Sequence, residues 1–447
     1  MRRGFLKDAK TKPTVRASTN PNSAQSPTYR EQIIGHPLDL GGRLPLDKSP
    51  IVCTIPANAR PGEPVAVCLI WPETKRLLLD TPGFLQSMET QTAGVQPAFR
   101  VAESPGKGIG LFATRPLKQG DLILQERPLL FTTLALPPPR RVVSASAVSV
   151  SLGNTAADDF ERHMQTLVDE MRPENRAEFM GLANSHVDGS SGPVHGRIRT
   201  NGCGVSGLRP GKWTGLEGRY SSLPANITRM NHSCSPNTQS RFDKASFSHW
   251  LFAARDIAEG EELTNNYATL LASAQRRKAE LSSYSFTCTC PACLDAPTSD
   301  PRRARLQVLT PNPAQWIVDW NLPKDLIIQQ CTEQIALIEK DGLQASNSFY
   351  MATSMLLVAY IALGDAPRAS LWAARLLKLP WMAHVEAQRS KLAQLLDPKK
   401  TAAFERCLLW RARVDRRRCF EVFNEHARVV RAFGEFIDPF LLPLQEE

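Results

Sequence analysis

The feature that most constrains this chain is a short run of three cysteines, Cys288, Cys290 and Cys293. Thiols this close together can converge on one ion, because a turn at Pro291 folds the segment back. Zinc takes four tetrahedral ligands, so a fourth ligand has to come from elsewhere. The alternative is three buried, inert cysteines, but this spacing is more typical of a metal site. We expect a structural zinc ion, since four thiolates leave no open position for substrate or water.

A second segment supplies the best fourth ligand, Cys234. It lies between two apolar stretches and reads Arg229-Met230-Asn231-His232-Ser233-Cys234-Ser235-Pro236-Asn237. Small hydrogen-bonding and turn-forming side chains in such density are typical of a folded-in loop that lines a pocket. His232 has three interpretations, a zinc ligand, a general base or a structural histidine, and the segment alone does not separate them.

Length and composition favour a globular protein of several domains. The chain has 447 residues, which suggests about three domains. It is 42% hydrophobic and 22% charged, close to the globular average, which excludes a mostly disordered chain. The longest apolar run, Met355 to Leu363, is much shorter than the roughly 20 residues of a membrane-spanning helix. We therefore expect a soluble protein.

The charge balance is basic and identifies no partner by itself. A count of 54 basic and 44 acidic residues gives a net charge of +10, concentrated near the N-terminus and between Arg406 and Arg418. We interpret both places as solvated charge and not as a nucleic-acid site. No secretory signal is visible, and a disordered tail is favoured over a mitochondrial transit peptide at the basic N-terminus. Without a secretory signal we expect a reducing compartment, where clustered cysteines are more often metal ligands than disulfides.

Two β-rich stretches are separated by a partly helical insert. Residues 97–131 and 219–270 alternate short apolar runs with turns, as at Gly106–Gly110, and Val65–Trp71 is a further strand candidate. Residues 158–182 have helical spacing, whereas 189–218 are rich in glycine and are expected to be irregular.

The chain turns helical after Pro301. Apolar residues recur at helical spacing over 327–338, 351–362 and 369–377, and we expect them to form a core. The hairpin stopped at Gly364 resembles one tetratricopeptide unit, but with one visible copy a plain helical bundle is the safer interpretation. Two further helices are expected at roughly 384–396 and 400–433.

Taken in order, four motifs resemble those of SET-domain protein-lysine methyltransferases. They are Gly106–Ala113, Arg229–Asn237, the run Gly260-Glu261-Glu262-Leu263-Thr264-Asn265-Asn266-Tyr267, and the cysteines from Cys288 to Cys293. The resemblance covers about residues 97–294 and is strongest to fungal SET proteins akin to the SET-and-MYND group. The insert holds a single cysteine, Cys203, so no MYND zinc finger can form there.

The resemblance implies S-adenosylmethionine as methyl donor and a protein lysine as acceptor. The residues that it implies at the donor are Lys107, Gly108, Gly110, Tyr220, Asn231, His232, Tyr267 and Phe286. Tyr267 would also be catalytic, by orienting the amine and the methyl group, although a packed strand tyrosine is the simpler interpretation of that residue alone. The implied zinc ligands are Cys234, Cys288, Cys290 and Cys293. Asn265 and Asn266 depart from the family's pattern, which bears on substrate preference and methylation state.

The implied chemistry is a displacement in which a lysine amine attacks the donor's methyl group. Lysine has a reference pKa near 10.4 and is charged at neutral pH. An apolar channel beside the positive sulfonium lowers that pKa by desolvation and like-charge repulsion. Positioning of the two partners then supplies much of the rate.

The fold class that follows is α+β, a SET-type β-rich core of short strands with knot-like threading. The expected segments are a disordered tail (1–50), an N-terminal extension (51–96), the first part of the SET domain (97–131), a partly helical insert (132–218), the second part (219–270), a zinc-binding post-SET segment (271–300) and an all-α C-terminal region (301–447).

A non-catalytic SET-fold scaffold, working through its helical C-terminal region, is the competing interpretation. Asn231, His232 and Tyr267 favour the enzyme, because a scaffold needs none of them. The expected partner is a histone or non-histone protein that bears a lysine, in the nucleus or the cytoplasm. We expect a monomer, with no membrane and no specific nucleic acid among its partners.

Overall fold

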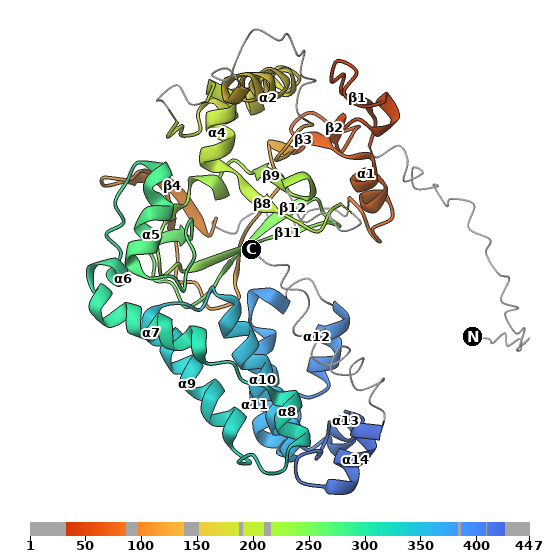
Figure 1. Cartoon of the computed structure of the whole chain (residues 1–447), viewed down its shortest axis with the longest axis vertical. Coiled ribbons are helices and arrows are strands. Elements are labelled where there is room, and N and C mark those ends of the chain that lie inside the picture. The colour runs from red at the N-terminus through yellow and green to blue at the C-terminus, as the bar shows by residue number, and fades with distance from the viewer. Residues whose placement is uncertain are drawn as a thin grey trace, which may run out of the picture.

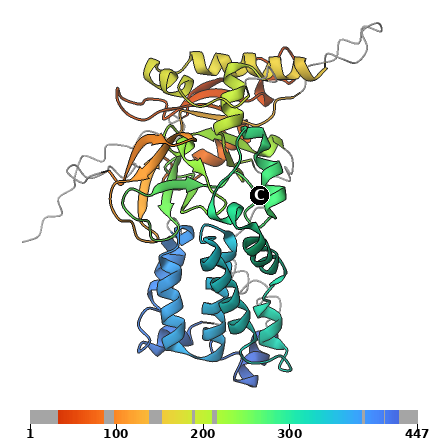
Figure 2. The same ribbon diagram turned by 90° about the vertical axis from the view of Figure 1, so that its left-hand side faces the viewer.

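The computed structural model describes residues 33–85, 97–137, 152–186, 191–209, 216–382, 386–407 and 409–424 (Figure 1). A β-rich part and a helical part lie end to end along the long axis, as Figure 2 shows from the side. Within these residues the strands form three sheets. This arrangement is the predicted α+β fold, with strands first and helices in the C-terminal region.

The largest sheet has β3 near its centre. Its order is β1 (Gly35–Pro37), β2 (Ile51–Ile55), β3 (Ala66–Ile70), β7 (Leu130–Thr133), β9 (Tyr220–Leu223) and β8 (Cys203–Val205). β3 is the strand predicted at Val65–Trp71, and all five of its residues are buried. Alternate side chains of β3 enter two separate hydrophobic clusters, so both faces of the sheet are covered. Helix α1 (Pro72–Leu79) follows directly.

Residues 33–50 differ from the predicted disordered tail. β1 pairs with β2, a short 3-10 helix spans Leu46–Lys48, and three apolar side chains are buried, those of Ile33, Leu38 and Leu40. The polar composition of this stretch conceals those anchors, which pack only once β2 and β3 are present. Residues 1–32, with the N-terminal basic cluster, lie outside the described residues.

Two smaller sheets bring the predicted motifs together. One has the order β10 (Asn231–His232), β13 (Glu262–Asn265), β5 (Gly108–Ala113) and β4 (Phe99–Ser104). The other has the order β11 (Thr238–Asp243), β12 (Ser248–Ala253) and β6 (Leu122–Glu126). In the first, β10 and β13 are parallel, with Asn231 opposite Thr264 and His232 opposite Asn265. Three motifs that are distant in the sequence therefore meet in one sheet.

The insert is more regular than predicted. Its helices are α2 (Leu152–Asp169), α3 (Pro173–Met180) and α4 (Pro193–Asn201). The expectation of irregular structure over 189–218 is wrong at α4 and at β8. Pro193 occupies the first turn of α4, where its missing N–H costs nothing, and the surrounding glycines hide that signal.

Helices follow from residue 274 onwards. α5 (Ala274–Leu281), a 3-10 turn (Ser282–Tyr284) and α6 (Pro291–Leu294) surround the cysteine segment. The C-terminal helices are α7 (Ala296–Val308), α8 (Pro313–Val318), α9 (Leu326–Asp341), α10 (Asn347–Leu363), α11 (Ala366–Leu377), α12 (Glu386–Ala393), α13 (Thr401–Glu405) and α14 (Arg416–Asn424). The predicted apolar stripes form their core, and Gly364 ends α10 in a left-handed conformation as expected.

One expected helix is wrong. Residues 400–433 do not form a single helix, because turns between α13 and α14 interrupt it and Arg411 has a φ of 63°. Residues 425–433 lie outside the described part of the chain. Across that described part, no helix is long and apolar enough to cross a membrane.

The six-stranded sheet crosses the predicted segment boundaries. It takes strands from residues 33–50 through β1, from the N-terminal extension, from both β-rich stretches and, through β8, from the insert. The sheet therefore joins segments that are distant in the sequence.

Candidate active site and metal centre

Asn231 takes part in a polar contact, centred on Glu262, that joins three motifs. Its Nδ2 donates to Glu262 Oε1 at 2.8 Å, and Lys107 Nζ donates to the other carboxylate oxygen at 2.9 Å. Gly110 leaves room for this contact, since a Cβ there would lie 2.8 Å from Glu262 Oε1. Burial acts to raise the pKa of Glu262, but the hydrogen bonds from Asn231 and Lys107 outweigh it and hold the pKa below its ordinary value.

His232 connects Tyr267 with the cysteines. The backbone N–H of Tyr267 donates to His232 Nδ1 at 2.9 Å, and His232 Nε2 lies 3.2 Å from Cys234 Sγ. With Nδ1 accepting, the neutral ring carries its proton on Nε2 and donates it toward sulfur. Burial lowers the pKa of His232 to about 4, so the ring is neutral at pH 7. This geometry fits the structural interpretation of His232 better than the ligand or the base.

Tyr267 lies two residues after the end of β13. Its hydroxyl donates to the carbonyl of Met230, and its ring centroid lies 4.9 Å from that of Tyr284 and 5.4 Å from that of His232. Burial, with a smaller contribution from Tyr284, raises the pKa of Tyr267. The hydroxyl therefore keeps its proton at neutral pH and remains a hydrogen-bond donor.

Two cavities share Tyr267 and Tyr284 in their walls. The larger has a volume of about 680 Å³ and is lined by Lys107, Asn231, His232 and Phe286 before it continues along residues 287–291. The smaller has a volume of about 310 Å³, and its lining includes Cys203, Met230, His249, Asn265 and Asn266. Of the described residues that line the smaller cavity, none carries a formal charge. The two tyrosines thus stand where a polar cleft meets a neutral one.

Phe286 and Gly108 reach this region. The Phe286 side chain is 39% exposed, and its ring centroid lies 6.0 Å from that of His232. Gly108 lines a third cavity of about 470 Å³, which runs from Lys107 to the insert at Asn184 and Ser185.

Tyr220 is not brought to these cavities. It is fully buried in the six-stranded sheet, where its ring stacks on that of Phe131 at 4.9 Å. Its hydroxyl lies 2.6 Å from Thr74 Oγ1 and accepts from the backbone N–H of Trp71 at 3.2 Å. Tyr220 therefore lies apart from the other residues that were predicted at the methyl donor. Its strand β9 pairs with both β7 and β8, and this interior position is invisible in the local sequence.

The four predicted cysteines converge. Their Sγ atoms all lie within 4.8 Å of one another, with Cys234 at 3.5 Å from Cys293 and 4.0 Å from Cys288. Sulfur ligands at about 2.3 Å from a tetrahedral zinc are about 3.8 Å apart, so these separations fit such an ion. Hydrogen bonds from Cys234 and Cys288 lower the pKa of the Cys290 thiol, while the pKa values of Cys234 and Cys288 are raised, so one thiolate is favoured among these three. The cluster could therefore hold a metal ion.

Two residues of the site are absent from the predicted set. Tyr284 lines all three cavities and contacts Tyr267, and Glu262 holds Asn231 and Lys107. The sequence offered a hint of each residue, because Glu262 lies inside the motif Gly260–Tyr267 and Tyr284 is two residues before Phe286. The sequence did not show which partner elsewhere in the chain each of them contacts.

A protein-family model described as "SET domain" matches residues 108–268 of this chain. This chain contains a SET domain. The match begins on β5 and ends just past Tyr267, so it spans both β-rich stretches and the insert between them. The predicted SET domain is confirmed.

Curated relatives share this SET domain at modest identity. The chain is 27% identical over 196 residues to "Histone-lysine N-methyltransferase set5" of Schizosaccharomyces pombe, covering 44% of this chain and 50% of that protein. It is 40% identical over 79 residues to "Histone-lysine N-methyltransferase SET5" of Meyerozyma guilliermondii (17% and 16%). It is also 40% identical over 78 residues to "Protein-lysine N-trimethyltransferase SMYD5" of Gallus gallus (16% and 18%). The chain thus matches half or less of the length of these relatives.

Proposed function

We propose that this chain is an S-adenosylmethionine-dependent protein-lysine methyltransferase. The observation that carries the proposal is the position of Tyr267, in the walls of both the polar cavity at Lys107 and Asn231 and the neutral cavity at Asn265 and Asn266. Methyl transfer needs donor and acceptor to meet at one point with their reacting atoms aligned. The donor supplies a methyl group on a positively charged sulfonium.

The larger cavity suits the donor. Its volume of about 680 Å³ is in the range of small-molecule sites, and its lining is mixed apolar and polar. Lys107 and Asn231 would bind the amino-acid end of the donor, and Gly108 and Gly110 would leave room for it. His232 would contact the donor from the same loop as Asn231. Phe286, with 39% of its side chain exposed, would pack against the adenine ring.

The smaller cavity suits the acceptor amine. Lysine has to enter as a neutral amine, and none of the described residues that line this cavity offers a carboxylate that would stabilise the ammonium form. The Tyr267 hydroxyl, protonated at neutral pH, would orient that amine toward the larger cavity. Tyr284 would form the other wall of the passage.

We propose zinc as the resident ion of the four cysteines. Its function would be structural, because four thiolates leave no coordination position for substrate. The ion would join the Asn231–Cys234 loop to the segment that carries Phe286, and so hold one wall of the donor cavity.

A histone is the acceptor to test first. Two of the relatives are named histone-lysine methyltransferases and one is named a protein-lysine trimethyltransferase. A histone acceptor would place the working protein in the nucleus, and a non-histone acceptor would allow the cytoplasm as well. We propose a monomer with no membrane partner.

Calorimetry on the purified, zinc-loaded full chain tests the function. We expect micromolar binding of S-adenosylmethionine, lost in Asn231→Ala and kept in Tyr267→Phe. With tritiated donor and core histones, the wild type should transfer label to lysine, whereas Tyr267→Phe should transfer at least tenfold less. Absence of donor binding in folded, zinc-containing protein would overturn the methyltransferase and leave the non-catalytic scaffold in its place.

A further inference from the structure

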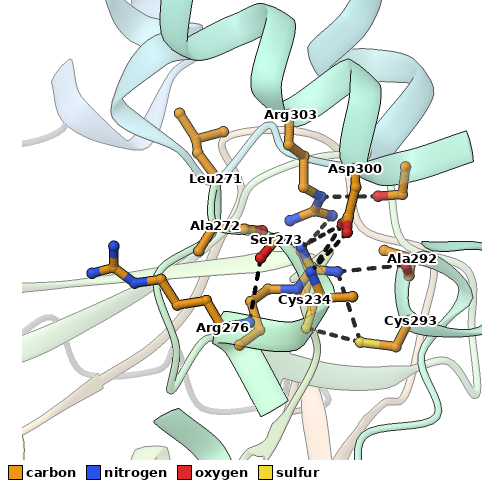
Figure 3. A network of polar contacts seen from close by, with 12 residues as sticks. Cys234, Leu271, Ala272, Ser273, Arg276, Ala292, Cys293, Asp300 and Arg303 are labelled. Carbon is orange, nitrogen blue, oxygen red and sulfur yellow. Dashed lines mark hydrogen bonds and ion pairs between the residues drawn. The ribbon is translucent and has the colours of Figure 1, made fainter. Parts of the chain in front are cut away.

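Arg277, on α5, is a buried cation beside the cysteine cluster. Figure 3 shows the neighbouring residues Cys234, Cys293 and Asp300. The Arg277 side chain has no exposed surface, and Nη2 lies 3.9 Å from Cys293 Sγ. The same nitrogen donates to the Ala292 carbonyl at 3.5 Å, and Nη1 donates to the Ala272 carbonyl. Its Nε–H has no hydrogen-bond partner among the described residues. The guanidinium thus contacts the thiol segment at Ala292 and Cys293, and also the turn that precedes its own helix.

The positive charge of Arg277 is only weakly balanced by carboxylates. Among the described residues its ion-pair partner is Asp300, at 3.4 Å, and the Asp300 side chain is 30% exposed. Both Asp300 oxygens also accept from the backbone N–H of Ala274 at 3.0 Å, so that carboxylate is shared with the start of α5. A buried charge whose carboxylate partner is partly exposed and shared is incompletely compensated. A further negative group close to Arg277 would complete that compensation.

Arg303 shows the contrast. It is equally buried, but its Nε lies 2.6 Å from Asp341 Oδ2, and Asp341 is itself 1% exposed. The charge of Arg303 is therefore balanced within the protein, and its Nη2 donates to the backbone carbonyl of Cys234 at 3.0 Å. Of these two arginines, Arg277 is the one whose guanidinium faces a thiol.

We propose that Arg277 is the charge-balancing residue of the four-cysteine metal site. Four thiolates around a divalent ion carry excess negative charge, and Arg277 offsets it from within contact distance of Cys293. The proposal rests on the proposed zinc site. It goes further because it assigns a role in retaining the ion to Arg277, a side chain that is not a metal ligand and does not belong to any of the motifs.

The test compares zinc retention in Arg277→Met, Arg277→Lys and the wild-type full chain. Methionine keeps the length and removes the charge, and lysine restores the charge without the planar fork. Arg276→Met is the matched control, because Arg276 is the preceding residue, is 69% exposed and pairs with Glu280. The readouts are zinc content by mass spectrometry, transfer of zinc to 4-(2-pyridylazo)resorcinol, and the sulfur-to-cobalt absorption band after cobalt substitution.

We expect Arg277→Met to weaken metal binding roughly 10- to 100-fold, the usual effect of removing a partner of a metal ligand. Arg277→Lys should recover most of that loss, and Arg276→Met should match the wild type. A wild type that holds no zinc would overturn the metal site itself. A zinc-containing wild type with equal retention in folded Arg277→Met would overturn only the assignment of Arg277. If Arg277→Met does not fold, a folded Arg277→Lys that loses zinc tenfold faster than the wild type would overturn it too, by showing that shape and not charge matters.

Discussion

At the residue scale, the contact among Lys107, Asn231 and Glu262 depends on a position without a side chain. Gly110 lies on β5, opposite Ala102 and directly against Asn231 and Glu262. An added Cβ would be 2.8 Å from Glu262 Oε1 and 3.0 Å from Asn231 Nδ2. The Glu262 carboxylate is the end of a flexible side chain, so it can move aside without unfolding the strand.

Gly110→Ala should therefore separate donor binding from stability. We expect a change of less than about 1 kcal/mol in the free energy of unfolding. We expect roughly tenfold weaker S-adenosylmethionine binding, equivalent to about 1.4 kcal/mol. Calorimetry and urea unfolding measure the two effects. Gly204→Ala on β8 is the control, because a Cβ there meets nothing within 4 Å. Equal donor affinity in Gly110→Ala would contradict a role for the three-residue contact.

His249, on β12, makes the stability of the protein depend on pH. Its Nε2 lies 2.8 Å from Ser222 Oγ, its Nδ1 lies 3.3 Å from Ser240 Oγ, and burial lowers its pKa to about 3. An unfolded histidine has a pKa near 6.5. Below about pH 6.5 the unfolded chain binds a proton that the folded protein excludes, so stability falls as the pH falls, by up to about 1.4 kcal/mol per pH unit.

His249→Gln should flatten this dependence between about pH 4 and 6.5. Urea unfolding at several pH values measures the slope, whatever the absolute stability of the variant. His36→Gln, at a side chain that is 66% exposed, should leave the slope as in the wild type. An unchanged slope in His249→Gln would mean that other groups carry the pH dependence.

At the element scale, α7 and α9 are fastened to the loop that carries Cys234. Asp341, the last residue of α9, accepts from Arg302 Nη2 at 2.7 Å and Ser299 Oγ at 2.9 Å, besides its pair with Arg303. Its backbone carbonyl accepts from Ser235 Oγ at 2.7 Å. The helical region therefore contacts the SET core next to the cysteine cluster.

Asp341→Asn should loosen this junction. It leaves two arginines without their carboxylate, and breaking a buried ion pair costs about 3–5 kcal/mol. Urea unfolding followed by tryptophan fluorescence measures the loss. Glu333→Gln is the control, because Arg305 and Glu333 join the same two helices in an exposed pair, and we expect no measurable change there. A loss of equal size in both variants would contradict the special position of Asp341.

At the scale of the whole molecule, the cysteine cluster joins parts that are far apart in sequence. Cys234 belongs to the SET core, and Cys288, Cys290 and Cys293 follow α5 and lead into the helical region. Losing the ion should therefore disturb both the donor cavity and the attachment of the helices.

Cys290→Ser should lower the thermal transition and weaken donor binding together, because one ligand fewer releases the ion. Calorimetric scanning, zinc content and donor titration measure the three effects. Cys407→Ser is the control, because Cys407 lies outside the cluster and its Sγ donates to the Ala403 carbonyl at 3.6 Å. A Cys290→Ser protein with full donor affinity and reduced zinc would contradict the link between the ion and the donor cavity.

The sequence by itself determined the features that depend on short spacings. The cysteines of the cluster, the Asn231–His232 pair, Tyr267 and the helical cores are all visible in local patterns, because each follows from turn chemistry or helical period. The SET domain followed from the order of those patterns along the chain.

The tertiary structure decided the rest, because contacts between residues distant in sequence leave no local period. The local sequence does not show whether Tyr220 lines a cavity or lies inside a sheet. The pairing of β9 with β7 and β8 buries it in the sheet. Residues 33–50 read as polar and become ordered only against β2. Nothing in the local sequence marks Arg277 and Arg303 as buried. The fold places their side chains against Cys293 and Asp341.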